Sequence, residues 1–157
     1  MHSIRYLLDT DMMIFMIRAL RKPKANASAK RKANRVIQRI KHETAKGVVV
    51  GVSAITVSEL EYGVANAECS ERERRAVYKV LAPFEWYEYE SENAPKHYGR
   101  VRRELEDKGT PIGAMDLLIA AHALSLGAVL VTNNTSEFGR ISGLHCENWT
   151  VNDTDGE

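Results

Sequence analysis

The stretch Ile4-Arg5-Tyr6-Leu7-Leu8-Asp9-Thr10-Asp11 decides the class of fold that we expect for this chain. A short apolar run ends in an acidic turn, and apolar residues then recur at helical spacing from Met12 to Leu20. A buried strand, a polar turn and a buried helix follow one another in this way in the repeating unit of a parallel sheet. The stretch therefore predicts an α/β protein.

Strands and helices continue to alternate along the chain. The β-branched run Val48–Val52 predicts a buried strand, and a helix follows it through Val64. An apolar helix over 115–126 ends at Gly127 and leads into a strand over Ala128–Thr132. This alternation predicts a sandwich in which helices flank a mainly parallel sheet.

The segments between these units complete the expected fold. We predict a basic loop around Pro23 over 21–32 and a helix over 33–46 that ends at Gly47. A charged helix over 71–81 and an aromatic strand over 84–89 follow. The last of these segments is a helix over 95–108, which Gly109-Thr110-Pro111 stops.

Length and composition fit one ordinary domain. A chain of 157 residues buries roughly two-thirds of the surface that it exposes when unfolded. Apolar residues make up 44% of it, and no run approaches the roughly 20 apolar residues of a membrane span. The first residues lead into the expected strand without the apolar core of a secretory signal. We therefore expect a cytoplasmic protein that does not enter a membrane.

Charge is distributed unevenly, and cysteine is scarce. Cys69 and Cys146 lack the spacing of a zinc site or of a disulfide framework. The formal net charge is +1, yet 11 of the 22 Lys and Arg residues fall between Arg18 and Lys46, where Glu43 is the only acid. The chain is nearly neutral as a whole and strongly basic in one segment.

Polar residues gather where the expected strands end. These are Asp9-Thr10-Asp11, Ser53 with the nearby Glu59, and Thr132-Asn133-Asn134, while Asp116 adds an acid to the first turn of an apolar helix. Sites in parallel sheets are built at the carboxyl ends of the strands. Carboxylates that converge repel one another unless a cation lies between them, and Mg²⁺ prefers such oxygen ligands.

Each of these acids also has a purely structural explanation. Asp9 or Asp11 fits a helix N-cap, and Thr56-x-x-Glu59 fits a capping box. Asp116 in a first turn interacts favourably with the helix dipole, and Glu137 fits a solvated loop. For any one of these acids alone, the structural explanation is the better one. Only the joint placement of the acids favours a functional site.

Three segments resemble successive acidic motifs of the PIN-domain toxins of the VapC type. They are Tyr6–Asp11, Ser53–Gly63 and Ile112–Ala123. The ending, over 130–138, 141–144 and 147–149, is similar to the branch of that family that cleaves initiator transfer RNA. The resemblance covers most of the chain except the basic segment 18–46. It implies a single PIN domain over 1–157, a three-layer sandwich in which 18–46 is a basic insertion.

The resemblance implies roles for individual residues. Asp9, Glu59 and Asp116 are expected to hold Mg²⁺, or Mn²⁺ in its place, directly or through water. Asn134 stands where many relatives have a fourth Asp, and Glu137 is close enough in sequence to supply the missing charge. Asp11 replaces the Asn that is more usual after Asp-Thr, and either compensates or caps.

The implied activity is that of an endoribonuclease toxin. Water activated by the metal would attack the phosphodiester and leave a 5′-phosphate and a 3′-hydroxyl. Asp9 and Asp116 would fix the metal, Glu59 would position the water or take its proton, and Asn134 or Thr132 would orient water or phosphate. The five histidines show no paired acid–base spacing, and His122 is expected to be packed.

The basic segment and the implied partners complete the expectation. Lys30, Arg31, Lys32 and Arg35 are predicted to bind the RNA backbone. A solvated helix face or a surface for an acidic partner explains the same charges nearly as well. The family implies a small VapB-type antitoxin, and we expect a homodimer.

Three other functions remain open on sequence grounds. A catalytically weak PIN-like module that binds RNA or protein is suggested by Asn134 in place of an acid. A flap-type DNA nuclease shares the acidic cluster, but no segment predicts a helical arch for DNA. A receiver domain would need a lysine after a late strand, and Thr132-Asn133-Asn134 offers none.

Overall fold

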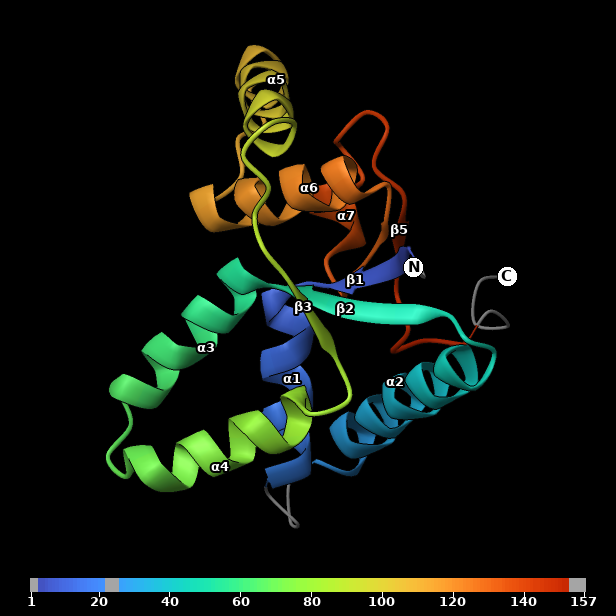
Figure 1. Ribbon diagram of the computed structural model, residues 1–157, viewed down its shortest axis with the longest axis vertical. Helices are drawn as coiled ribbons and strands as arrows, with labels where there is room; N and C mark the ends of the chain where they lie inside the picture. The colour runs from blue at the N-terminus through green and yellow to red at the C-terminus, as the bar shows by residue number, and fades with distance from the viewer. Residues whose placement is uncertain (1–2, 22–25, 153–157) are drawn as a thin grey trace.

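The computed structural model describes residues 3–21 and 26–152, and its centre is one parallel sheet (Figure 1). The strands are ordered β3-β2-β1-β4-β5, and every neighbouring pair is parallel. In chain order they are β1 Ile4–Leu8, β2 Val49–Ser53, β3 Glu85–Tyr87, β4 Val129–Val131 and β5 Cys146–Glu147. All carboxyl ends therefore lie at the same edge of the sheet.

Helices cover both faces of this sheet. They are α1 Thr10–Arg21, α2 Ala27–Ala45, α3 Ala54–Ala65, α4 Ser70–Leu81, α5 Ala94–Asp107, α6 Ala114–Leu126 and α7 Thr135–Phe138. In Figure 1, α1 to α4 lie below the sheet and α5 to α7 above it. The predicted α/β class and the three-layer sandwich are confirmed.

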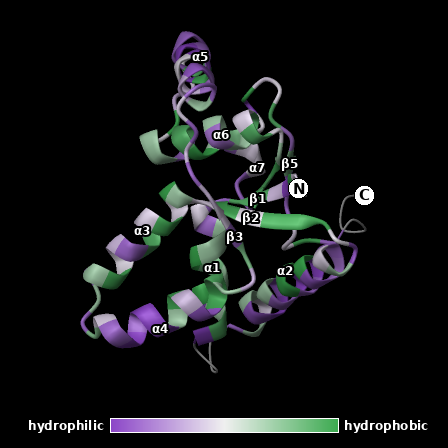
Figure 2. Ribbon diagram, viewed as in Figure 1, coloured by the Kyte–Doolittle hydropathy of each residue, from purple (hydrophilic) through white to green (hydrophobic). Residues whose placement is uncertain are grey.

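Alternation along the strands divides the core in two. Leu8 and Val131 pack with the helices α1 to α4, whereas Leu7 and Leu130 pack with α5 and α6. Successive strand residues point to opposite faces, and all four of these side chains are completely buried. Figure 2 shows the result, with β2 hydrophobic and the outer helix α5 largely hydrophilic. The sheet is covered on both faces, as its apolar strands predict.

The predicted basic loop is shorter than expected. Its central residues, including Pro23, lie outside the described residues, but α2 already begins at Ala27. The Asn26 side chain caps it by accepting a hydrogen bond of 3.0 Å from the Ser28 N–H. Ala, Lys and Arg are strong helix formers, so the first turns are helical although they bury almost nothing. Lys30, Arg31 and Lys32 are therefore on a helix, and the prediction of a loop there was wrong.

Other boundaries differ by small amounts, and two short elements were missed. The aromatic strand predicted over 84–89 is only the three residues of β3. No sequence pattern predicts α7 or the two-residue strand β5, which pairs with β4. No helix in the described part of the chain is long and apolar enough to cross a membrane.

Candidate active site

Asp9 lies at the centre of the carboxyl edge, between the last residue of β1 and the first of α1. Its Oδ1 accepts a hydrogen bond of 2.8 Å from the Met12 N–H, so it does cap the helix. Its Oδ2 is buried and has no hydrogen-bond partner within the described residues. The residue is 1% exposed, and burial raises the pKa of its carboxyl to about 6, although the nearby Thr132 hydroxyl and the Met12 N–H favour the ionised form.

Glu59 is held beside Asp9 by the neighbouring residue Thr10. The Thr10 hydroxyl donates to Glu59 Oε1 at 2.6 Å and lies 3.0 Å from the hydroxyl of Thr56. The capping-box interpretation of Glu59 was wrong, because Ser53 is the cap of α3 and accepts a hydrogen bond of 3.1 Å from the Ile55 N–H. Glu59 is half-buried and faces the acidic edge instead.

Asp116 brings a third carboxylate to the same place from the first turn of α6. Burial is the main cause that raises the pKa of its carboxyl to about 6, and the charges of Asp11, Glu137 and Glu59 add to it. The pKa of Asp9 is in turn raised by Asp11 and Asp116, after burial. Asp9 is therefore linked electrostatically to Asp11 and Asp116, and Asp116 in turn to Glu59 of α3 and Glu137 of α7.

Asn134 and Glu137 form a linked pair next to these acids. The Asn134 amide Nδ2 donates to Glu137 Oε2 at 2.6 Å, and the Asn134 N–H donates to the Thr132 hydroxyl at 2.9 Å. Thr132 is buried at the end of β4. The amide thus holds the Glu137 carboxylate, whose charge helps to raise the pKa of Asp116.

The donor set fits a hard divalent cation. A buried carboxylate oxygen without a partner is costly unless a cation neutralises it, and the acids Asp11 and Asp116 lie within electrostatic reach of Asp9. Among the described residues no three acidic, histidine or cysteine side chains are arranged to hold a metal ion as they stand. Mg²⁺ is typically bound by one or two carboxylates and several waters, so Asp9 and Asp116 would be enough as direct ligands. The presence of the ion stays a prediction.

Comparison with known proteins identifies the family. The family model described as PIN domain matches residues 6–144. Ribonuclease VapC2 of Haemophilus influenzae is 35% identical over 146 residues, which are 93% of this chain and 98% of the relative. The chain belongs to the VapC ribonucleases of the PIN-domain family. The predicted resemblance is confirmed.

Two further similarities bear on this VapC-family chain. The protein of Salmonella typhimurium named tRNA(fMet)-specific endonuclease VapC is 36% identical over 146 residues, 93% of this chain and 98% of the relative. The solved structure of VapBC2 from Rickettsia felis, bound to a DNA fragment from its promoter, has a TM-score of 0.77 and 34% identity. The matched region is 93% of this chain and 99% of the chain in the solved structure.

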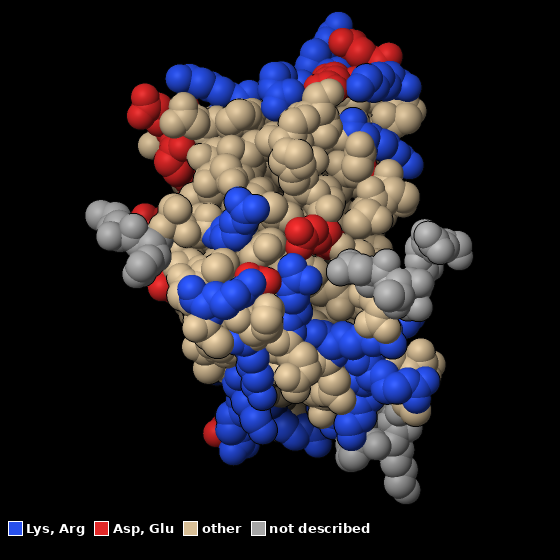
Figure 3. Space-filling model, turned by 90° about the vertical axis from the view of Figure 1, so that its right-hand side faces the viewer, with Lys and Arg blue, Asp and Glu red and all other residues tan. Residues whose placement is uncertain are grey.

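The predicted RNA-binding residues of this PIN domain do not share one environment. Lys30, Arg31 and Lys32 are exposed and form no side-chain hydrogen bond or ion pair within the described residues. Arg35 is half-buried and donates to the Thr150 carbonyl oxygen at 3.2 Å, which holds the segment after β5 against α2. Figure 3 shows that Lys and Arg gather over the lower part of the face where α2 lies. Three of the four cations are thus free to meet a ligand.

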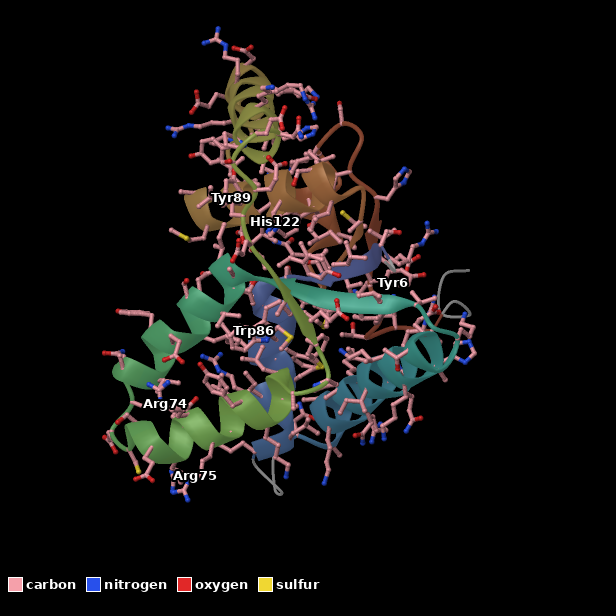
Figure 4. The ribbon with its side chains drawn as sticks, in the orientation of Figure 1. Tyr6, Arg74, Arg75, Trp86, Tyr89 and His122 are labelled. Atoms are coloured by element: carbon pink, nitrogen blue, oxygen red, sulfur yellow. The ribbon has the colours of Figure 1, made fainter. Side chains whose placement is uncertain are left out.

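His122 is packed in the core, as predicted, and it is a hydrogen-bond partner of the buried Ser53 side chain. Its Nδ1 lies 2.7 Å from Ser53 Oγ, and its ring meets that of Tyr89 edge to face at 5.6 Å (Figure 4). Ser53 Oγ also accepts the Ile55 N–H, so the same oxygen caps α3 and hydrogen-bonds to His122, in a contact where either atom can be the donor. Burial lowers the pKa of His122, which is completely buried. Ser53 therefore joins the end of β2 to α6.

Sequence reasoning missed the supporting residues of the site. Thr10 had no assigned role and Thr56 was considered only as a helix cap, although together they position Glu59. Their contact joins α1 to α3 across a separation of 46 residues. The only available signal was that both threonines lie within the acidic motifs.

Proposed function

We propose that this protein is a magnesium-dependent endoribonuclease and the toxin of a toxin–antitoxin pair. The observation that carries the proposal is the buried Oδ2 of Asp9, which has no hydrogen-bond partner among the described residues and lies near the acids Asp11 and Asp116. A structural cap needs one oxygen, and Asp9 already uses Oδ1 for that purpose. The second oxygen is available for a cation, which the other acids also favour.

The side chains divide the work of phosphodiester hydrolysis. When bound, the ion neutralises negative charge on the phosphate and makes water easier to deprotonate. Asp9 and Asp116 hold the ion. Glu59, fixed by Thr10, accepts the proton of the attacking water, while Thr132 and Asn134 orient water or phosphate. Attack of the water at phosphorus breaks the bond to the 3′-oxygen, which takes a proton from solvent water, so the products carry a 5′-phosphate and a 3′-hydroxyl.

We propose transfer RNA, and initiator tRNA in particular, as the substrate. The name of the Salmonella relative supports this choice. The exposed cations Lys30, Arg31 and Lys32 also suit a phosphate backbone, and RNA is read mainly in exposed loops. An anticodon loop offers both features.

The cognate partner is a VapB-type antitoxin, and an apolar groove is suited to receive it. The groove has a volume of about 610 Å³ and lies between α1, α2 and α4. Met16, Leu20, Ile37 and Val80 are among the residues that line it, and Leu20 is 39% exposed. The similar solved structures of Rickettsia felis and Salmonella typhimurium are VapBC complexes. An amphipathic segment of the antitoxin would bury this apolar surface.

Association of two copies stays a prediction for this chain. Light scattering of the purified protein at several concentrations measures it directly. The second candidate function, a PIN-like module with weak or no activity, is favoured only by Asn134 in place of an acid. The hydrogen bond from Asn134 to Glu137 weakens that argument, because it supplies a carboxylate nearby.

The proposal is tested by incubating wild-type protein and Asp9→Asn with total tRNA, with Mg²⁺ or with chelator. Discrete fragments from the wild type with Mg²⁺ alone would support it, and sequencing of the fragments names the RNA. Bound Mg²⁺ without cleavage of any RNA would support the binding module instead.

A further inference from the structure

A groove of about 590 Å³ leads away from the acidic edge between α1 and the start of α2. Asp11 and Asn133 line the end next to the acids, and Ala29 of α2 lies further along. Ile14 and Phe15 are half-buried members of its floor. The groove is therefore continuous with the site, is partly apolar and reaches the basic helix.

Arg18 is the cation of this groove. It is exposed, it lines the groove, and its guanidinium makes no hydrogen bond or ion pair with any residue that the structure describes. The other arginine along the groove, Arg21, is paired with Glu73 of α4. Arg18 alone of the two keeps its donors free for a ligand, and a guanidinium suits a phosphate.

The spacing along α1 matches a nucleic-acid strand. Asp11, Ile14, Phe15 and Arg18 follow one another at the intervals of one helix face. Seven residues of α-helix separate Asp11 from Arg18 by roughly 10 Å. A stacked strand rises roughly 3.4 Å per nucleotide, so Arg18 would meet a phosphate about three nucleotides from the acidic site.

We propose that this groove binds the single-stranded part of the RNA next to the cleavage point, with Arg18 holding a phosphate and the Phe15 ring in contact with a base. The inference rests on the proposed function and adds the path of the strand to it. Base stacking on aromatic rings together with backbone cations is the usual combination for single strands. The free cations that follow Ala29 on α2 would extend the path.

The test measures binding of a fluorescein-labelled oligouridylate of about ten nucleotides. All variants carry Asp9→Asn, so that the RNA stays intact. Arg18→Ala should weaken binding about fivefold to tenfold and reduce the slope of log affinity against log salt by about 0.7. Phe15→Leu, which removes the ring but leaves an apolar side chain on the core, should weaken binding without changing the slope. The control is Arg75→Ala, an exposed arginine on α4 that points away from the body of the molecule (Figure 4).

The outcomes separate the groove from the proposed function. Equal binding and equal salt slopes for Arg18→Ala and the parent would contradict RNA binding in the groove, even if the wild type cleaves RNA. The same result with weaker inhibition by the antitoxin would assign the groove to the antitoxin. Binding that depends on Arg18, in a protein whose wild type cleaves no RNA, would support the groove and contradict only the nuclease.

Discussion

The Thr10 hydroxyl donates a hydrogen bond of 2.6 Å to Glu59 Oε1 and so ties the first turn of α1 to α3. Thr10 directly follows Asp9, the proposed metal ligand, and is itself buried. The residue that follows Asp9 therefore positions the Glu59 carboxylate of α3. Disturbing it should disturb the reaction more than the fold.

Thr10→Val removes this donor and keeps the shape of the side chain. We expect the rate constant kcat to fall about 10-fold to 100-fold with little change in KM, because hydrogen bonds to charged groups contribute about 1.5–3 kcal/mol. Thr10→Ser, which keeps the hydroxyl, should retain most of the rate. Steady-state cleavage assays measure both variants. Equal rates for Thr10→Val and wild type would remove Thr10 from the mechanism.

Asp9→Asn should stabilise the metal-free protein while it abolishes the effect of Mg²⁺. The pKa of about 6 means that the buried charge destabilises the fold at pH 7.5, by about 1–3 kcal/mol. Urea unfolding in chelator measures the gain. Asp107→Asn, at an exposed residue of α5, is the control and should change stability by less than about 0.5 kcal/mol. A loss of stability in Asp9→Asn would contradict the account.

The stability of the metal-free protein should depend on pH with a defined sign. Asp9 and Asp116 have pKa values of about 6 in the folded state against an ordinary 3.8. Between about pH 4 and pH 6 the folded state binds more protons than the unfolded state, so stability falls as the pH rises and is constant above this window.

Magnesium should reverse the trend, because it binds the ionised carboxylates. Its thermal stabilisation should be full near pH 7.5 and lost as the pH falls below about 5. Thermal unfolding with and without Mg²⁺ at both pH values measures the difference. The same shift in melting temperature at pH 5 and pH 7.5 would argue against binding at these acids.

Glu137→Gln tests whether this acid replaces the missing fourth Asp. Asn134 donates a hydrogen bond of 2.6 Å to the Glu137 carboxylate and so holds it in place. Loss of this carboxylate in Glu137→Gln should weaken Mg²⁺ binding about tenfold. Adding Asn134→Asp to this variant returns a carboxylate and should restore part of the affinity. Titration calorimetry measures all three proteins. Unchanged affinity in Glu137→Gln would make Glu137 a solvated acid of α7.

Leu20→Glu tests the groove proposed for the antitoxin. Leu20 is exposed, so the charge should leave the fold intact, but it would be buried against an apolar partner. We expect at least about tenfold weaker inhibition by the cognate antitoxin with unchanged RNA cleavage. Leu20→Met is the matched apolar control. Full inhibition of Leu20→Glu would place the antitoxin elsewhere.

Elements that bury a regular apolar pattern were predictable from the sequence. The strand that ends at Leu8 and the helix that ends before Gly127 are local signals, and both are found where expected. The start of α2 was missed because its first turns are exposed and polar, so no apolar period marks them. A strand of two residues, such as β5, exists only through its pairing with β4.

The positions of the acids were predictable from the sequence, but the residues that hold these acids in place were not. Asp9, Glu59 and Asp116 lie within motifs that the sequence displays, and the structure brings them to one edge. That Thr10 and Glu59 are hydrogen-bonded depends on how α1 packs against α3, across 49 residues of sequence. The choice of Ser53 over Thr56 as the cap of α3 was likewise decided by where β2 ends.

The most direct test of the central claim is the chemistry of the fragment ends. Initiator tRNA is incubated with wild-type protein in Mg²⁺ and in chelator, and the new ends are identified by mass spectrometry. The account predicts 5′-phosphate and 3′-hydroxyl ends that form only in Mg²⁺. Cleavage that persists in chelator, or fragments that end in a 2′,3′-cyclic phosphate, would contradict it.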